Sequence, residues 1–380
     1  MALGVACSDE GDSSADGGNR RFVPLPAGSR EFDGIVNLVD ETAASELDAF
    51  LISGEGQPGL QGGLTASLNL FLEHYVEEYD FVYFLTDHAL GANTIGRFES
   101  VTQPAMPGIG RDSAEEREGY TTNGRTHAVI GIQFRAGRYG PIAHEMLHYW
   151  ANYLDQSFGF GFGLDEDFGA HWGYAGVHGV LGGFDPATLR CETPAGAMPP
   201  ACTPGANGRT RYVTGLYGEN DNGVATPCGP LELYLMGLIP LSEAPDDIPV
   251  LVDAGSLVYD TVAGTATVEA LGVTNVRLAD IVARHGTVRE IAANERAFRA
   301  VFVVLSATPA QDAVLTEIAD YAKWHGNRAM EPGVLSFEAL TGGRATLDTR
   351  LGSRRSVNDP APPVRVSTGH PTVRLIVHAR

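Results

Sequence analysis

The segment His-Glu-Met-Leu-His holds the residues of this chain that are best suited to chemistry. It places His144 and His148 four residues apart, with Glu145 beside the first histidine. The composition predicts roughly 0.02 matches to this HExxH spacing by chance. In a helix, the two histidines would lie about 40° apart on one face. Two neutral imidazoles so placed can hold Zn²⁺, and the neighbouring carboxylate can take a proton from metal-bound water.

The residues around this motif predict a buried helix. Pro141 suits a first helical turn because its missing N–H needs no partner there, and helical apolar spacing continues to about Tyr153. Apolar side chains cover most of the predicted circumference, which leaves only a narrow polar arc. Buried imidazoles and carboxylates are costly unless they are paired. A bound zinc ion removes that cost. The alternative is a hydrogen-bonded His–Glu–His stripe without a metal.

A catalytic zinc site needs a third protein ligand and an open position. The metzincin continuation is absent, because Ala151 and Leu154 stand where that pattern has Gly and His. We favour His171, since histidine is the commonest metal ligand and its glycine-flanked loop can approach an ion closely. Glu166 is the second candidate, and His178 is a further histidine nearby. The metal ligands that we predict are therefore His144, His148 and His171.

Two further features have a functional and a structural interpretation. Tyr234 could donate its hydroxyl hydrogen to the oxyanion of a tetrahedral intermediate, and Met236 could form an apolar floor under the metal. Both residues could instead fill the core. Oxygen-rich loops at Asp165–Asp167 and Asn220–Gly223 could bind Ca²⁺, although the second is also typical of a simple turn. We predict Glu145 and Tyr234 as catalytic residues.

The elements that must position these residues indicate an α+β fold with a mixed sheet, an HExxH helix and a mostly helical C-terminal part. Apolar and β-branched runs predict strands, and helical apolar spacing predicts helices. The expected strands are 80–85, 127–134 and 300–305. The expected helices are 46–51, 64–75, 141–153, 278–284, 288–299 and 310–324. By analogy with zincins, we expect strand 127–134 to form the sheet edge beside the cleft.

The composition limits the classes of protein to which this chain can belong. Of 380 residues, 43% are hydrophobic and 19% are charged, as in an ordinary globular protein. Lys and Arg number 26 against 47 Asp and Glu, which gives a net charge of −21. This balance argues against nucleic-acid binding and against a polybasic membrane-surface module. We expect a monomer that acts on a protein or peptide substrate, with a tether at 1–30, a catalytic domain at 31–350 and a tail at 351–380.

The cysteines point to a location outside the cytoplasm. The sequence Leu3-Gly-Val-Ala-Cys7 resembles the end of a bacterial lipoprotein signal, in which the cysteine is lipidated and anchors the protein to a membrane. A chance pentapeptide in a flexible tail is the alternative. Cys191 and Cys202 bracket a short loop and could form a disulfide, which requires an oxidising compartment. Cys228 would then stay free.

Several motifs together resemble a group of largely uncharacterised bacterial secreted zincin-like proteins. Besides HExxH, the resemblance rests on Ala170-His171-Trp172, Val180–Asp185, Pro230–Ile239, Gly108–Gly110 and Thr341–Asp348, and it spans roughly residues 75–350. The chain departs from the group at Leu147 and Tyr149, where Gly and Arg are usual, and at Leu231-Glu232-Leu233, where the group has Leu-Asp-Leu. The resemblance implies a zincin fold with His171 as the third ligand.

We therefore expect a secreted or surface-anchored zinc endopeptidase in which Glu145 is the general base. Two other functions stay open. One is a zinc hydrolase that acts on glycopeptide or peptidoglycan. The other is a non-catalytic surface lipoprotein with a structural metal, whose fourth ligand would be Glu166 or His178.

Overall fold

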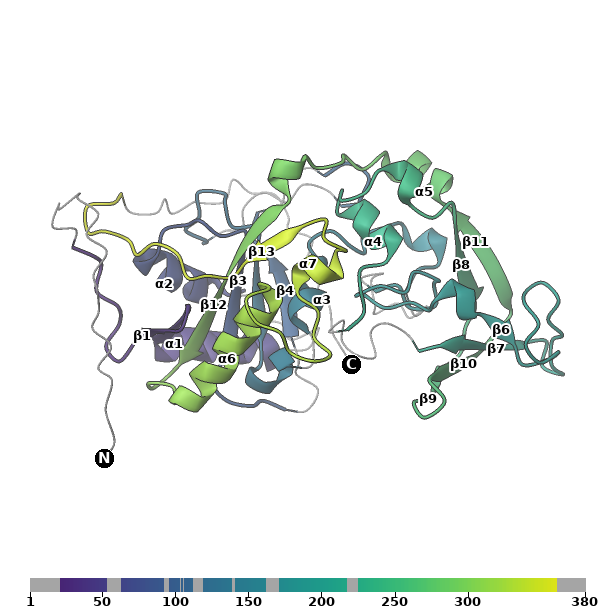
Figure 1. The fold of residues 1–380 in the computed structure, drawn as a ribbon, viewed down its shortest axis with the longest axis horizontal. Coiled ribbons are helices and arrows are strands. Elements are labelled where there is room, and N and C mark those ends of the chain that lie inside the picture. Colours follow the sequence, from purple (N-terminus) through teal and green to yellow (C-terminus); the bar gives the residue numbers. More distant parts are fainter. Residues whose placement is uncertain are drawn as a thin grey trace, which may run out of the picture.

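The computed structural model describes residues 21–52, 63–91, 96–102, 104, 106–111, 119–138, 141–161, 171–216 and 225–360. These residues form a mixed α+β structure with a mixed sheet, as the sequence predicts (Figure 1). None of the described helices is long and apolar enough to cross a membrane.

The main sheet has the strand order β1-β2-β12-β3-β5-β4, and β13 pairs with β12. Strands β2, β12, β3 and β5 are parallel, whereas β1 and β4 run antiparallel to their neighbours. The central strands are nearly continuous apolar runs because both of their faces are buried. The bounds are β1 Arg30–Phe32, β2 Ile35–Val39, β3 Phe81–Thr86, β4 Gly96–Ser100, β5 Ala128–Ile132, β12 Ala297–Ser306 and β13 Thr346–Asp348.

Helices cover both faces of this sheet. The side chains of β3 alternate between the two: Val82 and Phe84 pack with α1 (Glu41–Ile52) and α2 (Thr65–His74), whereas Tyr83 packs toward the opposite face. That opposite face carries α3 (Pro141–Leu147), α6 (Asp312–His325) and α7 (Phe337–Leu340). Helix α3, which contains His144 and Glu145, thus lies on the α6 side of the sheet.

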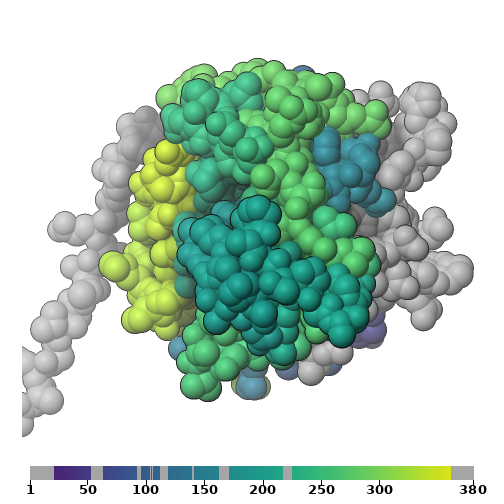
Figure 2. All heavy atoms as spheres, turned by 90° about the vertical axis from the view of Figure 1, so that its right-hand side faces the viewer, coloured from purple at the N-terminus to yellow at the C-terminus, as the bar shows by residue number. Residues whose placement is uncertain are grey.

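A second part, on the right in Figure 1, contains two small antiparallel sheets, and its teal and green residues lie in the middle of the face seen in Figure 2. The four-stranded sheet has the order β6-β7-β10-β9, and β8 pairs with β11. Helices α4 (Pro230–Leu235) and α5 (Leu278–His285) lie with them. The strand bounds are β6 Arg190–Cys191, β7 Thr210–Gly215, β8 Asp247–Val252, β9 Val258–Asp260, β10 Thr265–Ala270 and β11 Gly272–Arg277.

Three expectations about these elements are wrong. The C-terminal part is not mostly helical, since strands β8 to β13 lie there besides helices α4 to α7. The helix expected at 288–299 is absent; Ala293–Glu295 form a single 3₁₀ turn in a largely exposed segment, and β12 begins at Ala297. Strand β5 is not an edge, because it pairs with both β3 and β4. Among the described strands, β4 ends the sheet instead. Its charged residues Arg97 and Glu99 interrupt the apolar run from which a strand would be predicted.

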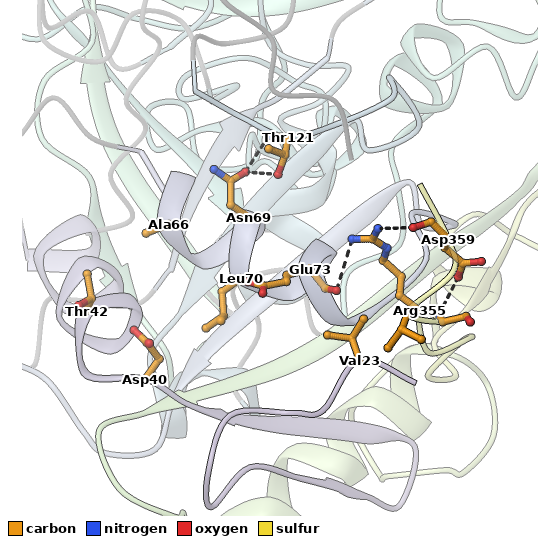
Figure 3. Close-up of a pocket in the computed structure, with 12 residues that line it drawn as sticks. Val23, Asp40, Thr42, Ala66, Asn69, Leu70, Glu73, Thr121, Arg355 and Asp359 are labelled. Atoms are coloured by element: carbon orange, nitrogen blue, oxygen red, sulfur yellow. Dashed lines mark hydrogen bonds between the residues drawn. The ribbon is translucent and has the colours of Figure 1, made fainter. Parts of the chain in front are cut away.

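The packed part of the chain extends beyond 31–350. Phe22 forms a β-bridge with Ser356, and Tyr75 forms one with Arg354. Beside α1 and α2, these end segments border a groove of about 750 Å³ (Figure 3). Arg355 lines this groove and donates to the backbone oxygens of Glu73 and Asp359 (Figure 3). This groove lies on the α1/α2 face, opposite α3, so it is separate from the HExxH residues.

The structure confirms the disulfide between Cys191 and Cys202, and Cys228 is free and buried. The bridge closes a loop with a sequence separation of 11, and a loop of that size stabilises the folded state by about 3 kcal/mol in the chain-entropy account. We expect the double Cys191→Ser, Cys202→Ser variant to unfold at a lower urea concentration. A reductant should lower the midpoint of urea unfolding for the wild type but not for the variant. Equal midpoints for oxidised wild type and variant would contradict this expectation.

His325, at the end of α6, should make the protein acid-sensitive. Burial lowers the pKa of His325 to about 4, and its Nε2 atom has no partner in the described protein. The unfolded chain takes up a proton near pH 6.5 but the folded chain only near pH 4, so lowering the pH between these values favours unfolding. The loss is at most about 1.4 kcal/mol per pH unit. The difference between the thermal unfolding midpoints of His325→Leu and wild type should therefore shift in favour of the variant when the pH is lowered from 7 to 5. A difference that does not change with pH would refute this prediction.

Candidate metal centre

Helix α3 is short and entirely buried. All seven of its residues, Pro141–Leu147, are buried, and the Tyr83 hydroxyl of β3 donates to the carbonyl of Ile142 at 2.9 Å. The helix ends earlier than the expected Tyr153. The backbone N–H groups of Tyr149 and Trp150 bond to carbonyls three residues back, which tightens the chain into a turn. His144 therefore lies in the helix, and His148 lies in the turn that follows it.

The structure brings His144, His148 and His171 together. The ring nitrogens that they can offer all lie within 4.8 Å of one another, and all three residues are buried. Ring centroids are 5.0 Å apart for His144 and His148, 5.0 Å for His144 and His171, and 5.2 Å for His148 and His171. These three histidines could hold a metal ion.

Hydrogen bonds on the far side of two rings orient their inward nitrogens. Nδ1 of His144 lies 3.1 Å from the carbonyl oxygen of Val180, and Nδ1 of His148 lies 3.2 Å from that of Ala151. A carbonyl can only accept, so each Nδ1 carries the hydrogen and each Nε2 keeps its lone pair. Nε2 of His148 is buried and has no partner in the described protein. Inward lone pairs with backbone-bound Nδ1–H groups are the usual arrangement of metal-binding histidines.

Electrostatics also favour neutral imidazoles. Burial lowers the pKa of His144 to about 3, and the neighbouring His171 adds to the effect. Burial, reinforced by His144 and His171, lowers the pKa of His148 well below its ordinary value. A metal ligand must be the neutral form of histidine. The donor set and its protonation therefore fit a divalent cation that prefers nitrogen ligands.

Glu145 lies next to these histidines but outside their group. Its side chain is fully buried, and neither carboxylate oxygen has a hydrogen-bond partner in the described protein. Burial raises the pKa of Glu145 to about 8, against the opposing charge of Arg97. A Cβ on Gly96 of β4 would come within 3.0 Å of Oε1, so the carboxylate packs closely on the end strand of the sheet. The chain thus holds one unpaired carboxylate beside three converging imidazoles.

The other residues that the sequence suggests for the site are either outside the histidine group or outside the described residues. Among the described residues that could hold a metal, the group contains His171 but not His178. Glu166, the Asp165–Asp167 run, Asn220–Gly223 and Cys7 lie outside the described residues. The roles suggested for them stay predictions.

Tyr234 is buried in α4, where its hydroxyl accepts a hydrogen bond from the backbone N–H of Val288 at 3.1 Å. The hydroxyl can still donate its own hydrogen. If Tyr234 stabilises an oxyanion, Tyr234→Phe should lower kcat for peptide hydrolysis by about 10²-fold or more with metal content unchanged. Full turnover and full metal content in that variant would leave Tyr234 with a packing role only.

A set of contacts that hold His148 leaves little trace in the sequence. Arg111 donates to the hydroxyl of Tyr153 at 2.7 Å, and its guanidinium carbon lies 4.4 Å from the centroid of that ring. The Tyr153 hydroxyl in turn donates to the backbone carbonyl of His148. Gly110 has a φ of 80°, and a Cβ there would come within 2.2 Å of the Tyr153 carbonyl. The glycines just before Arg111 were the available signal.

None of the family models, curated proteins or solved structures compared with this chain matches it. The resemblance to bacterial secreted zincin-like proteins stays a prediction.

Proposed function

We propose that His144, His148 and His171 bind Zn²⁺ and that the protein is a zinc-dependent endopeptidase. The observation that carries this proposal is the convergence of three buried imidazoles, with an unpaired carboxylate next to them in sequence. Three histidines are a known ligand set of catalytic zinc, which leaves one position for water or substrate. Bound zinc would polarise the scissile carbonyl and lower the pKa of water.

In this proposal the chain's own groups position the reactants and move the proton. The backbone carbonyls of Val180 and Ala151 fix two of the imidazole rings through their Nδ1–H groups. Glu145 takes the proton of the attacking water and returns it to the leaving amine, as a general base and then a general acid. Its position next to His144 in the chain, with both carboxylate oxygens free of hydrogen-bond partners in the described protein, suits it to both roles.

The position of β4 favours an extended peptide as substrate. Among the described residues this strand ends the sheet; its residues Arg97–Ser100 are buried, and the less buried Gly96 packs against Glu145. The ring of Phe98, two residues along the same strand, lies 6.3 Å from that of His148. A strand at the end of a sheet can bind an extended peptide by adding it as a further strand. A peptide bound along β4 would lie beside both the proposed metal ligands and the proposed base.

We further propose a location outside the cytoplasm, at the cell surface or beyond it, with a lipid anchor at Cys7. The disulfide between Cys191 and Cys202 supports an oxidising compartment.

The direct test is hydrolysis by protein with defined metal content. Purified protein loaded with zinc should cleave casein or a mixed peptide library. It should lose this activity after treatment with a chelator and regain it with one equivalent of zinc. A parallel zymogram with cell-wall material separates a peptidoglycan hydrolase from an endopeptidase. A zinc-loaded protein that cleaves neither polymer would favour the structural-metal alternative and contradict the proposal.

A further inference from the structure

A second buried carboxylate, Glu232 of α4, lies at the junction of three chain segments. Its side chain is fully buried. Oε1 accepts hydrogen bonds from Nε1 of Trp172 at 2.9 Å and from the backbone N–H of Leu181 at 2.8 Å. Oε2 accepts from the backbone N–H groups of Val180 at 2.9 Å and Gly229 at 3.0 Å. One carboxylate therefore holds together residues from both sides of the 172–181 loop and the start of α4.

Two of these partners are directly connected to proposed metal ligands. Trp172 follows His171 in the chain, so its indole hydrogen bond restrains the backbone that presents the His171 ring. The carbonyl oxygen of Val180 accepts a hydrogen bond from Nδ1–H of His144, with 3.1 Å between the two atoms. The backbone N–H of Val180 donates to the carboxylate of Glu232. A further hydrogen bond, from the backbone N–H of Trp172 to the Leu181 carbonyl at 3.1 Å, ties the two sides of the loop to each other.

We propose that Glu232 is a positioning residue for the metal centre, which sets the rings of His144 and His171 through the 172–181 loop. The inference rests on the proposed metal binding. It adds a residue that touches neither the metal nor the substrate. It also gives a function to the Leu231-Glu232-Leu233 motif, in which glutamate replaces the aspartate of Leu-Asp-Leu.

The chemistry of the four contacts requires a carboxylate. All four partners are N–H donors, and an ionised carboxylate offers only acceptors. Glutamine has the same shape, but its amide NH₂ would face two N–H donors and leave them without an acceptor. The 172–181 loop packs closely against the carboxylate of Glu232, because a Cβ on Gly179 would come within 2.2 Å of Glu232 Cδ.

Glu77, a half-buried carboxylate with the same number of donors, provides a control. Its carboxylate also accepts from four donors, the Thr122 hydroxyl and the backbone N–H groups of Asn123, Arg125 and Thr126. Those donors belong to the turn before β5, not to the loop that carries His171. Glu77→Gln thus disturbs a carboxylate-held turn of the same kind, and it measures the effect of a purely structural defect on the metal centre.

The experiment compares zinc affinity in wild type, Glu232→Gln and Glu77→Gln by competition with a chromophoric chelator. It is run at a temperature at which circular dichroism shows all three to be folded. Loss of a partner that orients a metal-binding histidine weakens metal binding by about 10–100-fold. We expect Glu232→Gln to weaken zinc binding by about 10-fold, with a changed visible spectrum of the cobalt-substituted protein, and Glu77→Gln to match wild type in both respects.

The outcomes separate this inference from the proposed function. Glu232→Gln with wild-type zinc affinity and cobalt spectrum would overturn the positioning role and leave the zinc site intact. Equal weakening in both variants would overturn it too, because the effect would then be general instability. A wild-type protein that binds no zinc would refute the proposed function and this inference with it. If Glu232→Gln does not fold, the deciding variant is Trp172→Phe, which removes one donor to Glu232 and keeps an aromatic ring. Weaker zinc binding in this variant would support the positioning role of Glu232, and unchanged zinc binding would reject it.

Discussion

Glu145→Gln is expected to lower kcat/KM for peptide hydrolysis by about 10²–10⁴-fold while the protein keeps its zinc, because a glutamine amide cannot take up the proton of water. The exchange should leave the fold intact. The two carboxylate oxygens have no hydrogen-bond partner in the described protein, so no bond is lost with the charge. Burial disfavours the charge of this carboxylate and raises the pKa of Glu145, so we expect an uncharged side chain of the same shape to fit there.

The measurement combines steady-state kinetics with zinc analysis of the same samples. Glu77→Gln serves again as the control, since its carboxylate holds the turn before β5 and lies outside the proposed site. It should retain activity much better than Glu145→Gln. Wild-type turnover in zinc-loaded Glu145→Gln would remove Glu145 from the mechanism. Loss of zinc together with activity would mean that Glu145 supports the metal site and does not move the proton.

Zinc binding by His171→Ala should weaken more than 100-fold, beyond the 10–100-fold that is typical when only an outer partner of a ligand is lost. The reason is geometric, because His171 supplies the third of the nitrogen atoms that lie within 4.8 Å of one another. His178→Ala is the matched control, a histidine seven residues along the chain that is not in the group. It should keep wild-type affinity.

Competition with a chelator of known affinity measures both variants. Unchanged zinc binding in His171→Ala would contradict the ligand assignment and turn attention to Glu166. Loss of zinc in His178→Ala would indicate a different ligand set from the one described. Either result would leave the HExxH pair in place but change the centre around it.

The sequence predicts the parts of this fold whose burial leaves a simple pattern. The apolar run in β3 and the helical spacing in α6 identify both elements because each buries a continuous face. Strand β4 was missed because Arg97 and Glu99 break its apolar run, although Arg97 is buried and bonds to the Phe50 carbonyl. Helix α3 was predicted too long, since periodicity does not reveal a turn that follows a buried helix.

The candidate site also contains residues that the sequence predicts and a residue that it does not. His144 and His148 follow from local spacing, and His171 from a glycine-flanked loop together with the resemblance to zincin-like proteins. Glu232 could not be assigned, because three of its four partners are backbone N–H groups that any residue can supply. Contacts of this kind arise only when distant loops come together, so they leave no residue pattern to recognise.

X-ray absorption at the zinc edge of the purified, zinc-loaded protein tests the central claim most directly. We expect one zinc per chain, with a first shell of three imidazole nitrogens at about 2.0–2.1 Å and one further light atom. A sulfur shell near about 2.3 Å, which would point to a cysteine such as Cys228, or a protein that retains no zinc, would contradict the account.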